Sequence, residues 1–251
     1  MKLAIAVAGK GGTGKTTLSA LLVRVFKEQG IGPILAVDAD PNSTLADALG
    51  TETGRPLAEI REESSSAEGA PASGMGRARA IDDEIQRSLV EADGFDLITM
   101  GRGEGPRCYC YVNTLLRKSL SSLTSNYNVL VLDNEAGMEH LSRRTTDNID
   151  LLFGVLNPTV PSLRAVERVV ALSRELPVNI ARRVAVVNRV GAEGTGEEID
   201  RRLEGLDVER FADIPQDDEL ERLGAVAGDV FSLPDDNPAL AAVRKMVKGL
   251  I

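Results

Sequence analysis

One segment near the start of the chain restricts the possible folds more than any other. Residues 9–16 read GKGGTGKT, which fits the pattern G-x-x-x-x-G-K-[ST]. The segment follows the apolar run Leu3–Ala8. It precedes apolar residues spaced as on one face of a helix, namely Leu18, Leu21, Leu22 and Val25. A strand, a glycine-rich turn and a helix in this order surround an anion with backbone N–H groups and a helix N-terminus. The sequence therefore predicts a phosphate-binding loop, called the P-loop below, at Gly9–Thr16.

Short apolar runs alternate with amphipathic helical patterns along the chain, which is typical of a mostly parallel sheet covered by helices on both faces. We expect strands at Leu3–Ala8, Ile34–Val37, Leu97–Met100, Val129–Leu132, Leu151–Leu156 and Val184–Val187. A further helix is expected between Thr114 and Leu123. The predicted fold class is α/β, a P-loop NTPase with a twisted sheet, formed by residues 1–251 as a single domain. Residues 61–80 lack an apolar period and are predicted to form a mobile surface loop.

The charge balance restricts the class of partner. The 251 residues include 29 Lys and Arg against 38 Asp and Glu, a net charge of −9. Because nucleic-acid binding depends on clustered basic residues, we expect no nucleic-acid partner. The two cysteines are too few for a disulfide scaffold. No secretory signal and no apolar run near the roughly 18 residues of a membrane span is present, so we expect a cytoplasmic protein with reduced thiols.

The P-loop predicts how a nucleotide is held. Lys15 would reach the β- and γ-phosphate oxygens, and Thr16 would ligate magnesium. Two acidic motifs follow predicted strands, Asp38-Ala39-Asp40-Pro41 and Asp133-Asn134-Glu135-Ala136-Gly137. Carboxylates at this edge of a parallel sheet can hold a magnesium-bound water or orient the attacking water, and the Gly137 N–H can sense the γ-phosphate. Taken alone, either Asp is explained equally well as a helix cap.

The base of the nucleotide is predicted from the end of a later strand, which reads Val187-Asn188-Arg189-Val190-Gly191. The Asp of the guanine-reading pattern Asn-Lys-x-Asp is missing. Asn188 can still pair with the adenine amino group, which favours ATP, although an Asn at a strand-to-loop turn is the alternative. The expected nucleotide-binding residues are Gly9, Lys10, Gly11, Gly12, Thr13, Gly14, Lys15, Thr16, Thr17 and Asn188.

The P-loop also carries a family resemblance. With Lys10 directly after Gly9, the segment resembles the deviant Walker A loop of the MinD/ParA/nitrogenase iron protein group. The resemblance implies that Lys10 reaches across a nucleotide-dependent homodimer to the partner's phosphates. It implies further that Asp40 orients the hydrolytic water, that Asp38 and Asp133 organise magnesium beside Thr16, and that Gly137 belongs to the switch II loop. Lys10, Lys15 and Asp40 are then the catalytic set.

Within this group, two segments resemble the CooC-type ATPases that help to insert nickel into carbon monoxide dehydrogenase. They are residues 107–113, RCYCYVN, and residues 133–145, DNEAGMEHLSRRT. The likeness extends over nearly the whole chain. It implies ATP-dependent nickel insertion, with carbon monoxide dehydrogenase or a related nickel enzyme as client. His140, Glu135 and Glu139 are more simply read as structural or solvated residues and are left out of the catalytic set.

Cys108 and Cys110 precede a predicted helix, where Arg107 and the helix N-terminus favour the thiolate form. Thiolates suit Ni²⁺ or Zn²⁺, but two per chain fill half of a four-coordinate site. A symmetric homodimer brings the same patches together and supplies the other half. The same four thiolates suit an iron–sulfur cluster, and two idle thiols are the structural alternative.

Other functions of this group stay open on the sequence. A MinD-like membrane-positioning ATPase needs a basic amphipathic C-terminal helix, and Leu240, Val243, Val247 and Leu250 have that periodicity. We favour a final helix packed on the sheet, because the span is short and has no bulky aromatic anchor. An iron–sulfur carrier or reductase of the nitrogenase iron protein type is a further alternative. A ParA-like DNA-partitioning ATPase is disfavoured by the acidic net charge.

Overall fold

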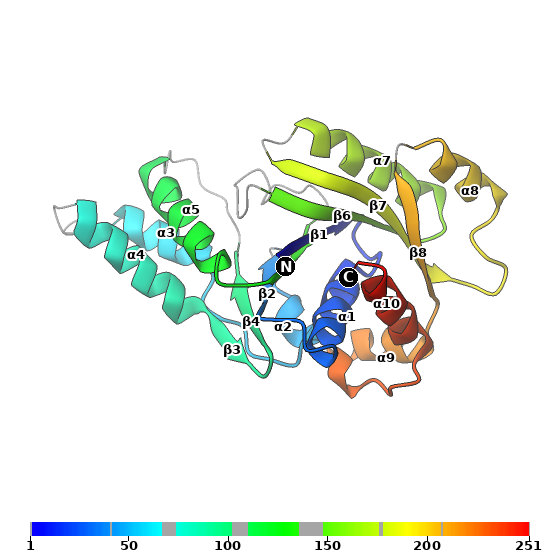
Figure 1. The fold of residues 1–251 in the computed structure, drawn as a ribbon, viewed down its shortest axis with the longest axis horizontal. Coiled ribbons are helices and arrows are strands. Elements are labelled where there is room, and N and C mark those ends of the chain that lie inside the picture. The colour runs from blue at the N-terminus through cyan, green and yellow to red at the C-terminus, as the bar shows by residue number, and fades with distance from the viewer. Residues whose placement is uncertain are drawn as a thin grey trace.

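The computed structural model describes residues 2–40, 42–66, 74–101, 110–135, 148–175, 178–206 and 208–250. Eight strands of this part form one sheet in the order β3-β4-β2-β5-β1-β6-β7-β8, in which β3 alone runs antiparallel to its neighbour (Figure 1). The strands are β1 (Leu3–Gly9), β2 (Ile34–Ala39), β3 (Val90–Ala92), β4 (Phe95–Thr99), β5 (Val129–Asn134), β6 (Asn148–Leu156), β7 (Asn179–Val190) and β8 (Glu209–Pro215). The predicted α/β class with a mostly parallel sheet is confirmed.

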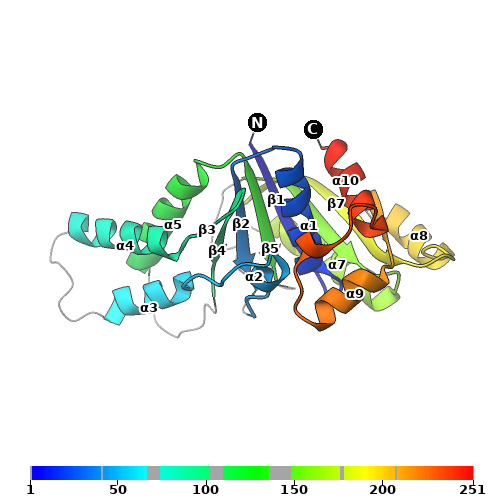
Figure 2. The same cartoon turned by 90° about the horizontal axis from the view of Figure 1, so that it is seen from below.

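Helices cover both faces of this sheet. They are α1 (Lys15–Glu28), α2 (Leu45–Ala48), α3 (Leu57–Ser66), α4 (Gly74–Ser88), α5 (Cys110–Thr124), α7 (Val160–Glu175), α8 (Glu197–Glu204), α9 (Asp218–Ala225) and α10 (Pro238–Lys248), with the 3₁₀ turn η1 (Val230–Ser232). Figure 2 shows α3, α4 and α5 grouped at the end of the molecule where β3 and β4 lie, with α8 at the opposite end.

All six predicted strands are present, but the two edge strands were missed. β3 has three residues, and β8 has a mostly exposed or half-buried pattern. An edge strand has a neighbour on one side only and needs no continuous apolar run, so the signal that identified the central strands is absent there. The predicted helix at Thr114–Leu123 lies within α5.

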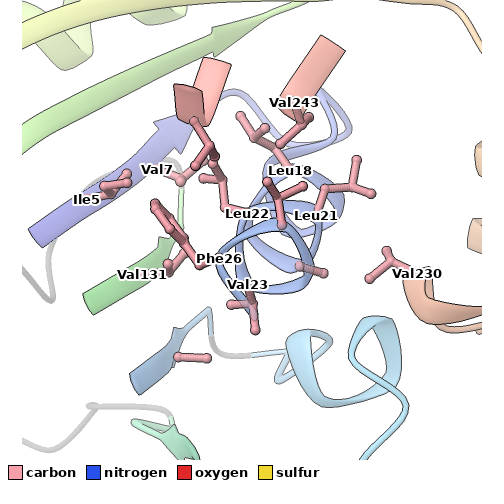
Figure 3. Packing of buried hydrophobic residues seen from close by; sticks show 14 of the residues in the cluster. Ile5, Val7, Leu18, Leu21, Leu22, Val23, Phe26, Val131, Val230 and Val243 are labelled. Atoms are coloured by element: carbon pink, nitrogen blue, oxygen red, sulfur yellow. The ribbon is translucent and has the colours of Figure 1, made fainter. Parts of the chain in front are cut away.

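The core explains why the central strands are apolar on both alternations. In β1, Ile5 and Val7 pack in one cluster with α1 and α10, whereas Ala6 and Ala8 belong to a second cluster on the opposite face. Figure 3 shows Leu22 and Phe26 of α1 on the side of the sheet to which Ile5 and Val7 point. A third cluster places α7 and α8 against β6 and β7. A strand that is buried on both faces needs apolar side chains at every position.

The prediction of a loop over residues 61–80 is wrong for residues 61–66 and 74–80, which are helical in α3 and α4. The apolar anchors of this helix pair are Leu57, Ile60, Ile81 and Ile85, which are buried. All four lie outside the Ser-rich window 61–80, so that window alone shows no apolar period. Arg55 adds ion pairs to Glu59, Glu63 and Glu84, which link the two helices. Residues 67–73 lie outside the described part.

The final helix α10 buries its apolar face in the core. Leu240, Val243 and Val247 are fully buried, and Leu250 packs partly buried against the same cluster. The periodicity of α10 is therefore explained by packing on α1 and β8. Among the described residues, no helix has both the length and the apolarity needed to cross a membrane.

Candidate functional site

The P-loop connects β1 to α1 and is organised around the main-chain oxygen of Lys10. This oxygen accepts hydrogen bonds from the Thr13 N–H at 3.3 Å and the Thr13 hydroxyl at 2.8 Å. The Lys15 ammonium donates to the same oxygen at 3.4 Å. None of the residues in the first turn of α1 is acidic, so no side chain of this turn itself neutralises the partial positive charge of the helix N-terminus. The loop has the architecture of an anion site.

Two glycines of the loop are required by close approach. A Cβ at Gly9 would lie 2.2 Å from the main-chain oxygen of Val155 in β6. Gly14 has a φ of 87°, and a Cβ there would lie 2.3 Å from the Asn188 Nδ2 atom. Only glycine lets the backbone pass this close to its neighbours. The pattern of the motif thus follows from packing as well as from phosphate binding.

The two predicted magnesium carboxylates, Asp38 and Asp133, meet beside the P-loop. They are register partners on the adjacent parallel strands β2 and β5, and both are fully buried. Register partners on adjacent parallel strands direct their side chains to the same face of the sheet. On that face lies α1, whose Thr16 hydroxyl donates to Asp133 Oδ2 at 2.6 Å. The structure therefore brings together Thr16, Asp38 and Asp133 as predicted.

Burial raises the pKa of Asp38 to about 6 and that of Asp133 to about 7. The hydrogen bonds that these carboxyl groups accept lower the pKa values, but burial outweighs them. Two buried carboxylates and a hydroxyl form the hard oxygen set that Mg²⁺ prefers, and a divalent cation would relieve the cost of burying two negative charges. The residues present fit magnesium.

Asp40 lies just beyond the end of β2 and is half-buried. Its N–H donates to Asp38 Oδ1 at 3.1 Å. Its own carboxylate oxygen Oδ1 accepts from the Asn42 N–H and from Asn42 Nδ2, both at 2.9 Å. In this conformation the carboxylate of Asp40 is held by its own loop, two residues away from the buried Asp38.

A pocket beside the N-terminus of α1 lies between the end of β7 and the start of α9. Its lining includes Gly14, Thr17, Asn188, Pro215 and Glu221. Asn188 Nδ2 donates to the main-chain oxygen of Thr13 at 2.8 Å, and its Oδ1 accepts from the Arg189 N–H at 2.9 Å. The side chain predicted to read the base thus also holds the P-loop. The adenine amino group is a donor, so the predicted contact would use the second lone pair of Asn188 Oδ1.

Two buried hydroxyl groups at this site were missed from the sequence. Ser19 of α1 donates to Asp133 Oδ1 at 3.2 Å and has no exposed surface. Thr99, at the end of β4, is the register partner of Asp38, and its hydroxyl has no hydrogen-bond partner among the described residues. A Ser within a helix and a Thr within a strand are ordinary, so no pattern distinguishes them.

The comparisons with known proteins agree with this geometry. Residues 4–227 match the family model described as CobQ/CobB/MinD/ParA nucleotide binding domain. The chain belongs to this CobQ/CobB/MinD/ParA nucleotide-binding family. The match spans the P-loop, both acidic strand ends and the pocket beside Asn188.

Two proteins of known sequence are similar to this chain over most of its length. The chain is 35% identical over 250 residues to an uncharacterized ATP-binding protein of Methanocaldococcus jannaschii, MJ0685, with 98% of each chain covered. It is 33% identical over 186 residues to the carbon monoxide dehydrogenase accessory protein CooC of Rhodospirillum rubrum, with 69% of this chain and 70% of that protein covered.

Solved structures of the family share the fold. The septum site-determining protein MinD of Pyrococcus horikoshii, solved with Mg-ADP, has a TM-score of 0.71 at 19% identity and covers 100% of this chain and 96% of its own. A chain of the MinC:MinD cell division protein complex of Aquifex aeolicus has a TM-score of 0.69 at 20% identity, with 100% of this chain and 95% of that chain covered.

Two predicted site residues, Gly137 of the predicted switch II loop and Cys108, lie outside the described part of the chain. His140 and Glu139, which are not in the predicted catalytic set, also lie outside it. Cys110 begins α5, but its side chain is not among those described. The described side chains include no group of three or more His, Cys, Asp or Glu suited to a metal ion. The thiolate metal site therefore stays a prediction.

Proposed function

We propose that this chain is a magnesium-dependent ATPase of the MinD/ParA type. The observation that carries the proposal is the hydrogen bond between Thr16 Oγ1 and Asp133 Oδ2, at 2.6 Å, beside the in-register Asp38. The bond joins the first turn of α1 to the end of β5, and the strand register places Asp38 at the adjacent end of β2. The relative of M. jannaschii that matches along 98% of the chain is named as ATP-binding, which supports ATP as the nucleotide.

In this proposal the P-loop N–H groups and Lys15 hold the phosphates. Thr16, Asp38 and Asp133 hold magnesium, which when bound neutralises charge on the β- and γ-phosphate oxygens. Asp40 orients the attacking water once its carboxylate leaves Asn42. Its N–H donates to Asp38 Oδ1, so a change at the buried carboxylate is transmitted directly to this loop.

Lys10 is proposed to act on a second copy of the chain. Its main-chain oxygen is tied by Thr13 and Lys15, whereas the residue itself is exposed. A lysine whose backbone is anchored and whose residue is exposed at a phosphate site can reach a partner's phosphates with little cost in backbone order. We therefore propose that ATP promotes a homodimer with Lys10 across its interface.

We further propose that the ATPase cycle serves nickel insertion into carbon monoxide dehydrogenase or a related nickel enzyme. The 33% identity to CooC of R. rubrum supports this assignment. Cys108 and Cys110 of two chains would together supply four thiolates to Ni²⁺ or Zn²⁺. Closure of the dimer around ATP would then bring the two pairs together, so metal and nucleotide would raise each other's affinity.

The ATPase assignment is tested by ATP hydrolysis and ATP binding in three lysine variants. Lys15→Ala should lose binding and hydrolysis. Lys10→Ala should keep binding of ATP by the monomer but lose hydrolysis and ATP-dependent dimerisation. Lys2→Ala changes an exposed lysine at the opposite end of β1 and should match the wild type in both assays. Hydrolysis that survives in Lys15→Ala would refute the proposed site.

The nickel assignment needs a separate measurement. Anaerobically purified protein is mixed with Ni²⁺ and ATP, and the bound metal per chain is measured together with the mass in solution. We expect one metal ion per dimer, lost in the Cys108→Ala/Cys110→Ala protein, whose ATP binding should stay as in the wild type. Equal metal content in the double variant would refute the thiolate site and leave the ATPase proposal intact.

A further inference from the structure

Asp133 is held at both of its carboxylate oxygens by one helix. Thr16 donates to Oδ2 at 2.6 Å, and Ser19 donates to Oδ1 at 3.2 Å. Residues three apart in a helix lie on the same side, one turn above the other, so α1 presents both hydroxyls to the end of β5. Neither Asp133 nor Ser19 has exposed surface.

The position of Ser19 is otherwise an apolar one. Its neighbours along α1 are Leu18, Ala20 and Leu21, all buried in the core. A serine in a helix commonly turns its hydroxyl back to a carbonyl of the preceding turn. Here the hydroxyl donates to a residue 114 positions away. An alanine at this position would fill the same space and would spare the cost of burying a hydroxyl, so packing does not explain the serine.

The carboxylate of Asp38 is also hydrogen-bonded at both of its oxygens. Asp38 accepts the Leu45 N–H at Oδ2, at 2.9 Å, and the Asp40 N–H at Oδ1, at 3.1 Å. Both oxygens of each Asp are therefore restrained. For Asp38 the donors are backbone groups, whereas for Asp133 they are two side chains. One of these two, Thr16, is itself a proposed magnesium ligand.

We infer that Ser19 is a positioning residue for the magnesium-binding carboxylate of Asp133. This inference rests on the proposed function. If Thr16 binds the metal, Ser19 is the remaining hydrogen-bond donor from α1 that fixes the orientation of Asp133. Ser19 would keep Oδ1 occupied, so that Oδ2 of Asp133 would remain for the metal. Hydrogen-bond partners of metal ligands set metal affinity in this way, and their loss lowers that affinity about 10- to 100-fold.

The test measures ATP affinity over a magnesium titration and in excess EDTA. In Ser19→Ala, the Mg²⁺ concentration for half-maximal binding should rise about tenfold, while the affinity in EDTA should stay within about twofold of the wild type. Ser88→Ala is the matched control. Ser88 is also a buried helical serine with one hydrogen bond, to the Ile85 carbonyl at 2.8 Å, but it lies at the end of α4. This control should leave the magnesium titration unchanged.

Four results of the same experiment are distinct. A magnesium titration of Ser19→Ala that matches the wild type overturns the inference, as does an equal loss of affinity with and without Mg²⁺, which indicates general damage to α1. Ser19→Thr keeps a hydroxyl and should restore at least part of the magnesium response. A wild-type protein whose ATP affinity does not respond to Mg²⁺ overturns the proposed function itself.

Discussion

Asn188 Nδ2 donates a hydrogen bond to the main-chain oxygen of Thr13 at 2.8 Å and so ties the end of β7 to the P-loop, 175 positions away in sequence. The close contact needs Gly14, where a Cβ would lie 2.3 Å from the same nitrogen atom. Asn188 thus holds the P-loop, in addition to its predicted contact with adenine.

These two roles predict different losses of affinity. Asn188→Ala should lower the affinity for both ATP and GTP about fivefold, because loss of one hydrogen bond of about 1 kcal/mol loosens the P-loop whichever base is bound. Any additional loss for ATP alone measures the adenine contact. Competition binding with both nucleotides gives the two values. Asn179→Ala, at the exposed start of the same strand, should change neither, and an unchanged GTP affinity in Asn188→Ala would contradict the P-loop role.

The buried carboxyl of Asp133 predicts how the metal-free, nucleotide-free protein responds to pH. Its pKa is raised to about 7 from 3.8, so between about pH 4 and pH 7 the folded protein keeps a proton that the unfolded chain has released. Stability should therefore fall as the pH rises through this window. Asp133→Asn removes the titrating group and should make the curve shallower, with the remaining slope due to Asp38, whose pKa is raised to about 6.

Urea denaturation at a series of pH values provides the measurement. Asp133→Asn should gain stability over the wild type at pH 8, by about 1 to 3 kcal/mol, and should show no gain at pH 4. The same variant should lose magnesium-dependent ATP binding. A wild-type stability that does not change between pH 4 and pH 7 would contradict the raised pKa.

We expect a substitution at Thr99 to increase the stability of the protein. The Thr99 hydroxyl is fully buried and lacks a hydrogen-bond partner within the described part of the chain. Thr99→Val keeps the branched shape and removes the unsatisfied group, so the free energy of unfolding should rise by about 1 kcal/mol. Ser88→Ala removes a hydroxyl that is bonded and should lower it by a similar amount. A loss of stability in Thr99→Val would show that the hydroxyl has a partner in solution.

Alanine substitutions at two P-loop glycines should differ in their effect on stability. Gly9→Ala forces a Cβ to 2.2 Å from the Val155 carbonyl oxygen, and we expect a loss of about 3 kcal/mol or more in unfolding free energy. Gly11→Ala meets nothing within 4 Å and should change stability by about 0.5 kcal/mol or less. Thermal and urea unfolding of the nucleotide-free proteins compare the two. Equal losses would contradict the close approach of β1 to β6.

Much of the fold was predictable because its signals are local. A buried parallel strand is apolar along its whole length, and a P-loop needs its glycines and its lysine in consecutive positions. The edge strands β3 and β8 and the helix pair α3 and α4 lack such local signals and were not predicted. Their stability comes from one-sided pairing and from a few buried anchors such as Ile60 and Ile81, which no short window displays.

The sequence by itself determined the α/β class, the central strands, the P-loop and the acidic residues that follow two of them. Only the tertiary structure decided which polar groups meet. The register of β2 against β5 places Asp38 beside Asp133, and α1 crosses that pair so that Thr16 and Ser19 face one carboxylate. Hydrogen bonds between residues more than 100 positions apart depend on strand order and helix rotation, which the packing of the whole core sets. Local pattern therefore identifies the P-loop, whereas the orientation of the proposed magnesium ligands is a property of the folded chain.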